Sequence, residues 1–360
     1  MPAKKRIALV SGFWGQNIGN AFFNLGGKYV LEQAFPECEV AFIQDQPAYW
    51  TFHNKMKGNP KNDLVLLRFL ETDYIVLQGP MLGLPFRAIW EETFRALTKK
   101  GTKIILLSAA LFKYTDEEIR ATTDFLTQYP PAIISTRDAD TYDVVRGLCP
   151  NVHSGIDSGF FTPEVYHPFS LDMGPFVTIN FDRFPEPRIT VGPRGERRGG
   201  KCDKEFDALG CRWTLRFPKF QMRCSQMGKW QAYIGAWFDW RRLPARIGDY
   251  AVVRPEHRCN PHVTWKIYRQ PNAVASDEPF TYFTIYANAA LTLSDRVHAC
   301  IVTLAYGRPA MLFTPSPRSR LFARLGLEDI KERPVTLDPS LLAREKQAEL
   351  DFMRRAAAKL

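Results

Sequence analysis

The feature that most constrains the fold is an alternation of short apolar runs with longer helical patterns over the first 165 residues. Near-continuous apolar strands that alternate with helices predict a parallel sheet covered by helices on both faces. We therefore expect a doubly wound α/β domain over residues 1–165. The predicted strands are residues 6–12, 39–43, 73–78, 102–108 and 132–136, and the predicted helices are residues 20–34, 61–70, 86–99, 115–127 and 138–147.

The second half of the chain shows a similar alternation after a linker with two prolines at residues 162–169. We expect a second α/β domain over residues 170–335, followed by a C-terminal helix within residues 338–360 that Asp338 and Pro339 begin. Two open α/β domains would face each other across a cleft, and such sheets bind ligands beyond the carboxyl ends of their strands. The predicted strands are residues 176–181, 250–254, 290–293 and 309–313, and the predicted helices are residues 279–288, 296–306, 317–325 and 340–358.

Length and composition favour a globular protein that functions in the cytoplasm. The 360 residues are 45% apolar, and the longest apolar runs are shorter than the ~20 residues of a membrane-spanning helix. The four apolar residues after Lys4–Arg6 are too few for a secretory signal. We expect the seven cysteines to be free thiols, since they include no C-x-x-C pair. We expect no metal, because the spacings among Cys202, Cys211, Cys224, His257, Cys259 and His262 match no standard zinc pattern.

The net charge of +10 is concentrated in one segment. Residues 183–246 contain 15 Lys and Arg against 6 Asp and Glu, a local excess of +9. Such a segment attracts phosphates, nucleic acid or lipid headgroups, although the part between Gly192 and Gly200 reads equally well as a solvated loop. Its aromatic residues could form a wall on which sugars stack, or could pack in a core. They are Trp213, Phe217, Trp230, Trp237 and Trp240.

A glycine-rich turn follows the first predicted strand, at residues 11–27. It is neither the dinucleotide-binding nor the Walker pattern. Gly19 permits close approach of the backbone to a ligand, while Asn17 and Asn20 suit either sugar hydroxyls or helix capping. Gln78 ends the third strand at a tight turn, where it would face the cleft or serve the turn itself.

Two further turns carry charged side chains. Asp138 is expected to cap a helix, with Arg137 as its partner. In S-D-R-V-H, residues 294–298, the tripeptide Arg296-Val297-His298 would occupy the first turn of a helix, directly after a buried strand. Backbone amides, a guanidinium and an imidazole would then form an anion site with a proton-transfer group. The alternative is that Arg296 pairs with Asp295 and that His298 packs in a core.

The block S-D-R-V-H-A-C-I-V-T-L-A-Y-G-R-P resembles the R-x-H helix of the polysaccharide pyruvyl transferases. N-I-G-N at residues 17–20 agrees in order and spacing, as do S-T-R-D-A-D-T-Y-D-V-V and H-S-G-I-D-S-G-F-F within residues 135–161. The likeness covers both ends of the chain and omits roughly residues 183–246. The chain differs from the family in having Gly19-Asn20 where Gly-Asp is common, and Gln78-Gly79-Pro80 where a glycine-rich turn is common.

The resemblance implies two Rossmann-like domains in a GT-B-like arrangement and transfer of the pyruvyl group of phosphoenolpyruvate onto hydroxyls of a sugar in a polysaccharide or its precursor. Arg296 and Val297 would bind the donor, and His298 would act as acid and base. A second arginine, Arg183 or Arg254, would hold the other anionic group, and no metal or other cofactor would be needed. The N-terminal domain would bind the acceptor through Asn17, Gly19, Asn20 and Gln78.

The partners expected are a sugar or lipid-linked glycan and no nucleic acid, with peripheral contact at the inner membrane face as a hypothesis from the local charge. Two alternatives remain: a GT-B glycosyltransferase that uses a nucleotide-sugar, and a non-catalytic protein that binds nucleic acid or another polyanion through residues 183–246. The acceptor sugar, the stereochemistry and the oligomeric state stay open.

Overall fold

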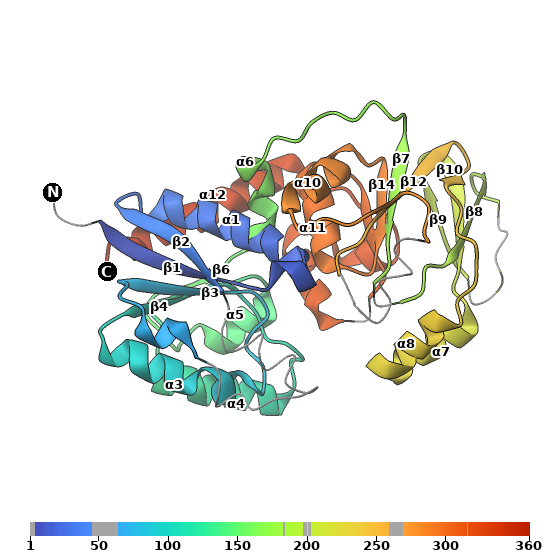
Figure 1. The fold of residues 1–360 in the computed structure, drawn as a ribbon. Coiled ribbons are helices and arrows are strands. Elements are labelled where there is room, and N and C mark those ends of the chain that lie inside the picture. Colours follow the sequence, from blue (N-terminus) through green and yellow to red (C-terminus); the bar gives the residue numbers. More distant parts are fainter. Residues whose placement is uncertain are drawn as a thin grey trace.

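The computed structural model describes residues 4–44, 64–182, 184–196, 200, 203–258, 269–314 and 316–360. The N-terminal part is built on a six-stranded sheet in the order β2-β1-β3-β4-β5-β6 (Figure 1). Each pair of neighbouring strands is parallel, and all five positions of β3 are buried. The five strands predicted here are confirmed, and β6 is additional. The strands are β1 (Lys5–Ser11), β2 (Cys38–Gln44), β3 (Tyr74–Gln78), β4 (Lys103–Ala109), β5 (Ile133–Thr136) and β6 (Val152–Ser154).

Helices cover both faces of this sheet and form a separate apolar core on each. α1 (Gly19–Ala34) packs in one core, and α3 (Phe86–Lys99) and α4 (Asp116–Gln128) pack in the other. α4 begins where the Thr115 side chain accepts from the backbone N–H of Glu118, and its first turn is acidic, as the helix dipole favours. The chain also forms α5 (Ala139–Val145) and the 3₁₀ turns η1 (Trp14–Gln16) and η3 (Leu66–Phe69). Of the helix expected at residues 61–70, only this last turn is formed, and residues 61–63 lie outside the described part.

A second sheet follows in the order β11-β12-β7-β14-β15, with β13 beside β12. Its core strands β12, β7, β14 and β15 are parallel, as the sequence predicts. The strands are β7 (Phe176–Asn180), β11 (Arg246–Ile247), β12 (Tyr250–Pro255), β13 (Ala273–Val274), β14 (Leu291–Ser294) and β15 (Ala310–Leu312). The associated helices are α10 (Pro279–Asn288), α11 (Val297–Ala305), and the 3₁₀ helices η5 (Pro317–Leu325) and η6 (Glu328–Lys331).

The basic aromatic segment inserts into this second domain between β7 and β11. It forms an antiparallel sheet in the order β8-β10-β9, and then a helical hairpin. The fully buried Trp213 joins this small sheet to the core of the larger one. The elements are β8 (Arg188–Pro193), β9 (Lys204–Ala208), β10 (Cys211–Arg216), α7 (Lys219–Met227) and α8 (Lys229–Trp237).

The two α/β units are joined by packing as well as by the chain. The connection between them contains η4 (Ser158–Phe161), which packs against α1, and α6 (Thr162–Val165), which forms the first part of the predicted linker. Phe22 of α1 packs among Tyr282, Phe283 and Tyr286 of α10. The terminal helix α12 (Pro339–Ala357) returns to α1, as Figure 1 shows. None of the helices in the part described here is both long and apolar enough to cross a membrane.

Replacing Gly26 by Ala is expected to destabilise the protein, because α1 approaches η4 closely at this point. A Cβ at Gly26 would lie 1.9 Å from the carbonyl oxygen of Ser158. The backbone must move, at a cost of roughly 1–3 kcal/mol in the free energy of unfolding. Denaturant unfolding of Gly26→Ala measures it. Gly147→Ala is the control, since a Cβ there meets no atom within 4 Å; equal stability of the two variants would contradict the close packing.

Candidate functional site

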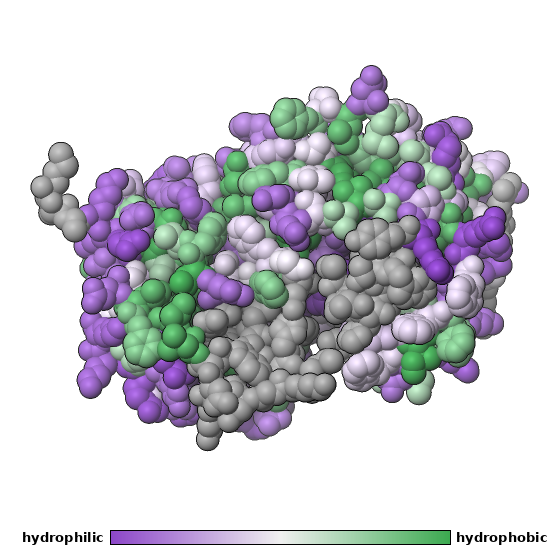
Figure 2. Space-filling model, viewed as in Figure 1, coloured by the Kyte–Doolittle hydropathy of each residue, from purple (hydrophilic) through white to green (hydrophobic). Residues whose placement is uncertain are grey.

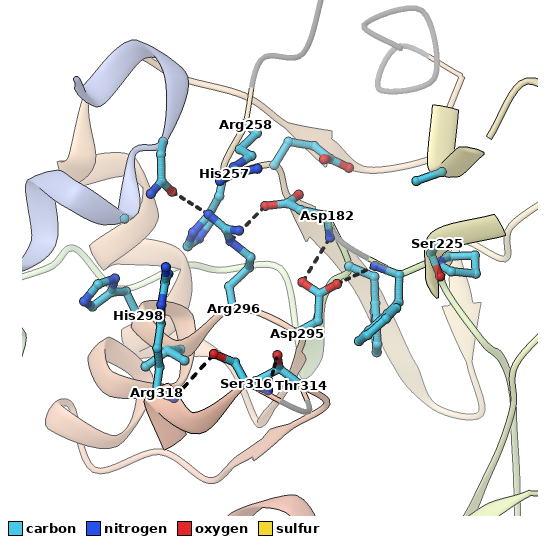
Figure 3. Close-up of a pocket in the computed structure, with 18 of the residues that line it drawn as sticks. Asp182, Ser225, His257, Arg258, Asp295, Arg296, His298, Thr314, Ser316 and Arg318 are labelled. Carbon is cyan, nitrogen blue, oxygen red and sulfur yellow. Dashed lines mark hydrogen bonds and ion pairs between the residues drawn. The ribbon is translucent and has the colours of Figure 1, made fainter. Parts of the chain in front are cut away.

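A cavity of about 800 Å³ lies between the two α/β units (Figure 3). It is lined by segments that follow the carboxyl ends of strands in both sheets: Asn17 after β1, Lys113 after β4, Asp182 after β7 and Arg296 after β14. This is where open α/β sheets bind ligands. The predicted location of the site between the two domains therefore coincides with a real cavity.

Arg296 connects the two sides of this cavity. Its Nη2 donates a hydrogen bond of 2.6 Å to Oδ1 of Asn17, and its Nε lies 3.3 Å from Oδ2 of Asp182. The Arg296 side chain is 17% exposed. It is the N-cap of α11, and Val297 is the first helical residue. The helix therefore begins one residue later than predicted. The guanidinium of Arg296 lies just before its first turn and pairs with Asp182.

Asp295 holds the loop that carries Asp182. Its two carboxylate oxygens accept from the backbone N–H groups of Asp182, at 3.1 Å, and Phe184, at 2.7 Å. Figure 3 shows these contacts beside the one between Arg296 and Asp182. The backbone N–H of Arg296 in turn donates to Oγ of Ser294 at 2.9 Å. A short chain of polar contacts thus fixes both the arginine and its counter-charge.

His298 lies in the first turn of α11 and faces the same cavity. Its side chain is 15% exposed, and its ring stacks obliquely on Phe23 of α1 at 4.9 Å between centroids. Gly19 lies beside it: a Cβ at this glycine would be 3.5 Å from Nδ1 of His298. The imidazole is therefore held between the two units with one edge open to the cavity.

Behind His298 lies a buried ion pair. Oδ2 of Asp157 is 3.6 Å from Nε2 of His298 and 2.7 Å from Nη1 of Arg137. Asp138 caps α5 as predicted, by accepting from the backbone N–H of Thr141. The prediction that Arg137 pairs with Asp138 needs correction, because Arg137 contacts Asp157 from the next polar segment of the chain.

The environment sets the protonation of this group. Burial lowers the pKa of His298 below its ordinary 6.5, and the negative charge of Asp157 opposes this effect without cancelling it. Burial acts to raise the pKa of Asp157, but attraction to His298 and Arg137 outweighs burial and keeps that pKa below its ordinary value. In the ligand-free site at neutral pH, His298 is therefore a neutral imidazole beside an ionised carboxylate.

Asn17, Gly19 and Asn20 all line the cavity, as predicted. Asn17 uses its oxygen for Arg296 and donates its Nδ2 to Oδ1 of Asn20 at 3.0 Å. No side-chain cap is formed at the start of α1, whose N-cap is Ile18. The two asparagines thus take part in the site instead of capping the helix.

Gln78 is not on the cavity. It is 8% exposed and lies behind α1, where its Oε1 accepts from Asn24 at 2.8 Å and its Nε2 donates to Ser158. A Cβ at Gly27 would lie 1.7 Å from Nε2 of Gln78, so this glycine leaves room for the amide. Gln78 belongs to a buried polar chain that joins α1, β3 and η4.

The structure does not bring Arg254 to the cavity either. The residue is 1% exposed, and its guanidinium donates to both carboxylate oxygens of Glu186 at 2.8 Å. It also donates to the carbonyls of Pro271 and Pro244. The other candidate for a second cation, Arg183, lies outside the described residues.

Three further cationic residues line the cavity that were not predicted from the sequence, namely Lys113, Arg258 and Arg318. Lys113 is in a loop whose backbone N–H groups at residues 112–114 all donate to Oε2 of Glu118. The guanidinium of Arg318 lies 4.4 Å from the ring centroid of Phe112 across the cavity mouth. The sequence could have indicated Lys113 and Arg258 by their position, because each of them follows a strand.

His257 also lines the cavity and was not predicted as a site residue. It is 3% exposed, with Nε2 2.5 Å from the hydroxyl of Tyr286. Burial, followed by the charge of Arg296, lowers its pKa well below 6.5. Its carbonyl accepts from the backbone N–H of Ile18 at 3.1 Å, so this residue ties the second unit to the first.

The described residues show neither a group of metal ligands nor the aromatic wall that the sequence left open. Among the described residues, no three His, Cys, Asp or Glu side chains gather to hold a metal ion. Cys202, Cys259 and His262 lie outside those residues. The residues that line the described part of the cavity include none of the aromatics considered for a sugar-stacking wall, which are Trp213, Phe217, Trp230, Trp237 and Trp240.

Residues 17–193 match the family model described as polysaccharide pyruvyl transferase. The resemblance predicted from the sequence is confirmed over this span. The match supports a pyruvyl transferase role in polysaccharide synthesis. It includes Asn17, Arg137 and Asp157 and ends before Arg296 and His298. No curated protein matches the chain by sequence.

Among solved structures, the S. aureus MnaA–UDP co-structure superposes with a TM-score of 0.52 at 13% identity, covering 98% of this chain and 90% of that one. This likeness shows the fold, and the predicted GT-B-like arrangement of two Rossmann-like domains is confirmed. A structure described as a putative UDP-N-acetylglucosamine 2-epimerase from Listeria monocytogenes has a TM-score of 0.49 at 12% identity, covering 99% of this chain and 91% of that one.

The imidazole of His298 is expected to titrate below pH 6.5 in the ligand-free protein, because burial disfavours its charged form. Histidine ring resonances followed by NMR against pH give the midpoint, and His298→Gln assigns the signal by its loss. In Asp157→Asn, loss of the nearby negative charge should move the midpoint lower still. A midpoint at or above 6.5 in the unsubstituted protein would contradict the site as described.

Proposed function

We propose that the chain transfers the pyruvyl group of phosphoenolpyruvate onto hydroxyls of a sugar in a polysaccharide or its precursor. One observation carries the proposal: the three segments that resemble the pyruvyl transferases meet at one cavity. Asn17 from the first contacts Arg296 from the third, and Asp157 of the second, which pairs with Arg137, lies beside His298 of the third. Asn17 and Arg296, which contact each other directly, are 279 positions apart in sequence.

The donor is doubly anionic, so it needs two separate positive regions. Arg296 and the backbone amides at the start of α11 supply the first, as a guanidinium and a helix N-terminus both favour a carboxylate or phosphate. Lys113, Arg258 and Arg318 line the same cavity and are the candidates for the second. Charge complementarity of this kind needs no metal ion, and we propose that the enzyme uses none.

The chemistry requires a proton at the methylene carbon of the donor. Protonation there makes C2 electrophilic, a sugar hydroxyl adds to C2, and inorganic phosphate leaves when the bond between C2 and the phosphate oxygen breaks. Addition of a second hydroxyl of the same sugar gives a ketal. One hydroxyl proton replaces the proton given to the methylene carbon, and the other leaves with the phosphate as HPO₄²⁻.

His298 is the group we assign to these proton transfers. It is neutral in the ligand-free site, and a bound phosphate raises its pKa by direct attraction. The imidazole thus takes up a proton with the donor, gives it to the methylene carbon and regains one from the acceptor hydroxyl. Asp157 stabilises the imidazolium from behind and keeps the ring oriented.

The acceptor is assigned to the N-terminal side of the cavity. Asn17, Gly19 and Asn20 lie there, and amide groups suit sugar hydroxyls because they both donate and accept. Gly19 leaves room for close approach beside His298. We propose a neutral or lipid-linked glycan as the acceptor, and no nucleic acid.

Phosphoenolpyruvate is expected to stabilise the protein against heat, and Arg296→Ala to weaken this effect. Loss of a charged hydrogen-bond partner should reduce affinity by about 10–100-fold. Thermal shift and calorimetry with phosphoenolpyruvate, UDP, UDP-sugars and duplex DNA measure it. Arg333→Ala is the control, since this arginine is 66% exposed and pairs with Asp329 in η6, away from the cavity.

The same ligand panel separates the alternatives. Stabilisation by UDP or a UDP-sugar with no response to phosphoenolpyruvate would favour a glycosyltransferase. Salt-sensitive binding to any duplex that Arg296→Ala leaves unchanged would favour a polyanion-binding protein.

His298→Ala is expected to slow transfer of radiolabelled pyruvyl groups onto polysaccharide by roughly 10²–10⁴-fold, the usual loss for an acid–base group. Its affinity for phosphoenolpyruvate should change far less than that of Arg296→Ala. His167→Ala, at an exposed histidine outside the cavity, is the matched control. Equal transfer rates for the two histidine variants would exclude His298 from the reaction.

A further inference from the structure

The α7–α8 hairpin presents an unusual number of large apolar side chains to solvent. Seven of them are between 52% and 73% exposed. Figure 2 shows hydrophobic side chains over this part of the surface, at the lower right. Contiguous apolar patches on a water-soluble surface commonly mark an interaction site. The seven residues are Phe220, Met227, Trp230, Ile234, Trp237, Phe238 and Trp240.

Helical spacing places the five of these side chains that lie within α7 and α8 on one face of each helix. Trp230, Ile234 and Trp237 are four and three residues apart along α8, and Phe220 and Met227 are seven apart along α7. Residues with this spacing point to the same side of a helix. The two helices are packed tightly, since a Cβ at Gly235 would lie 2.8 Å from Cβ of Cys224. The hairpin is therefore one unit with a common outer face.

The other side of the same hairpin faces the cavity. Gln221 and Ser225 of α7, and Ala232, Tyr233 and Ala236 of α8, line the cavity wall. These are polar or small side chains, in contrast with the large apolar ones outside. None of the seven exposed apolar residues lines the described part of the cavity, which leaves their exposure unexplained by sugar binding.

The charge around the exposed face has one sign. Residues 217–238 contain three basic and no acidic residues. Lys219 and Arg223 are exposed on α7, and Arg242 follows the hairpin in an exposed position. The nearest acidic residue, Asp239, accepts two hydrogen bonds of 2.8 Å from Arg241, so its charge is balanced locally.

We propose that the outer face of the α7–α8 hairpin docks onto an anionic lipid surface. Tryptophan rings prefer the boundary between headgroups and hydrocarbon, and Lys and Arg beside them attract acidic headgroups. A short amphipathic helix with Trp on one side and basic residues at its flanks lies in the plane of such a boundary. A protein partner of this basic face would have to be acidic and apolar together, and the excess of tryptophan favours lipid.

Docking in this way would set the cavity beside the membrane. The hairpin is one helix thick, about 10 Å, and the cavity begins on its inner side. This step rests on the proposed function: a sugar attached to a lipid phosphate would reach Asn17 and His298 while its lipid stays in the bilayer. The lipid contact itself requires no catalysis, so it can be tested separately.

The test is flotation of the full chain with vesicles of phosphatidylcholine alone and vesicles that also contain phosphatidylglycerol. The unsubstituted protein should float with the anionic vesicles only. The triple variant Trp230→Ser, Ile234→Ser, Trp237→Ser should lose at least about 100-fold in partition coefficient, given the apolar surface removed. Lys219→Glu with Arg223→Glu should lose roughly 5-fold for each charge removed and show less dependence on salt.

Phe169→Ser is the matched control, because Phe169 is 75% exposed but lies in the connection before β7, outside the hairpin. It should float like the unsubstituted protein. Circular dichroism and phosphoenolpyruvate-induced thermal shift verify that each variant is folded with an intact cavity. Equal flotation with both vesicle types, or normal flotation of the triple variant, would overturn the proposal. A dimer in light scattering that the triple variant abolishes, without flotation, would assign the face to a second copy and equally overturn it.

Discussion

The site depends on one buried ion pair, between Arg137 and Asp157. Both side chains are at most 1% exposed, so their mutual attraction has to offset the desolvation of two charges. The same carboxylate lies beside His298 of the second domain and accepts from the backbone N–H of Gly159 in the connection between the domains. Loss of either partner alone would leave an uncompensated buried charge, at a cost of about 3–5 kcal/mol. The carboxylate that partly offsets the effect of burial on the pKa of His298 is therefore also a group that holds the two domains together.

Arg296 shows how a binding group can be oriented before its ligand arrives. Asn17 and Asp182 hold the guanidinium from opposite sides, and Asp295 fixes the backbone that carries Asp182. A long side chain that is already ordered loses less rotational freedom on binding, which favours affinity. A bound anion must, however, compete with Asp182 for the guanidinium. The backbone amides at the start of α11 offset this cost to binding, because they add hydrogen-bond donors that Asp182 does not use. The pairing thus tunes the affinity of the cavity without closing it.

The sequence predicted the fold better than it predicted which charged side chains reach the cavity. Apolar periodicity is a local property of the sequence, so α3 and α10 begin and end where the pattern predicts them. Arg254 lies near the carboxyl end of a parallel strand and Arg296 follows another, yet Glu186, 68 residues away, covers Arg254. Contacts over such distances follow from tertiary packing, which periodicity does not specify. Family-like motifs partly overcame this limit, because they pointed to the passage that contains Asp157, but they did not show that its carboxylate would meet Arg137 and His298.

The inserted aromatic segment shows that composition also does not determine where a side chain lies. Its sequence is compatible with a core, a sugar-binding wall or a lipid contact, and the structure gives its rings three different environments. Trp213 is fully buried between the small and the large sheets, Tyr233 lines the cavity, and Trp230 and Trp237 are more than half exposed on the outer face of α8. Exposing large apolar rings to water is unfavourable, whereas the amphipathic indole is stable where one side meets hydrocarbon and the other meets water. A hairpin with a polar, cavity-lining inner face and an aromatic, basic outer face therefore fits an enzyme whose acceptor is presented at a membrane surface better than one whose acceptor diffuses freely in water.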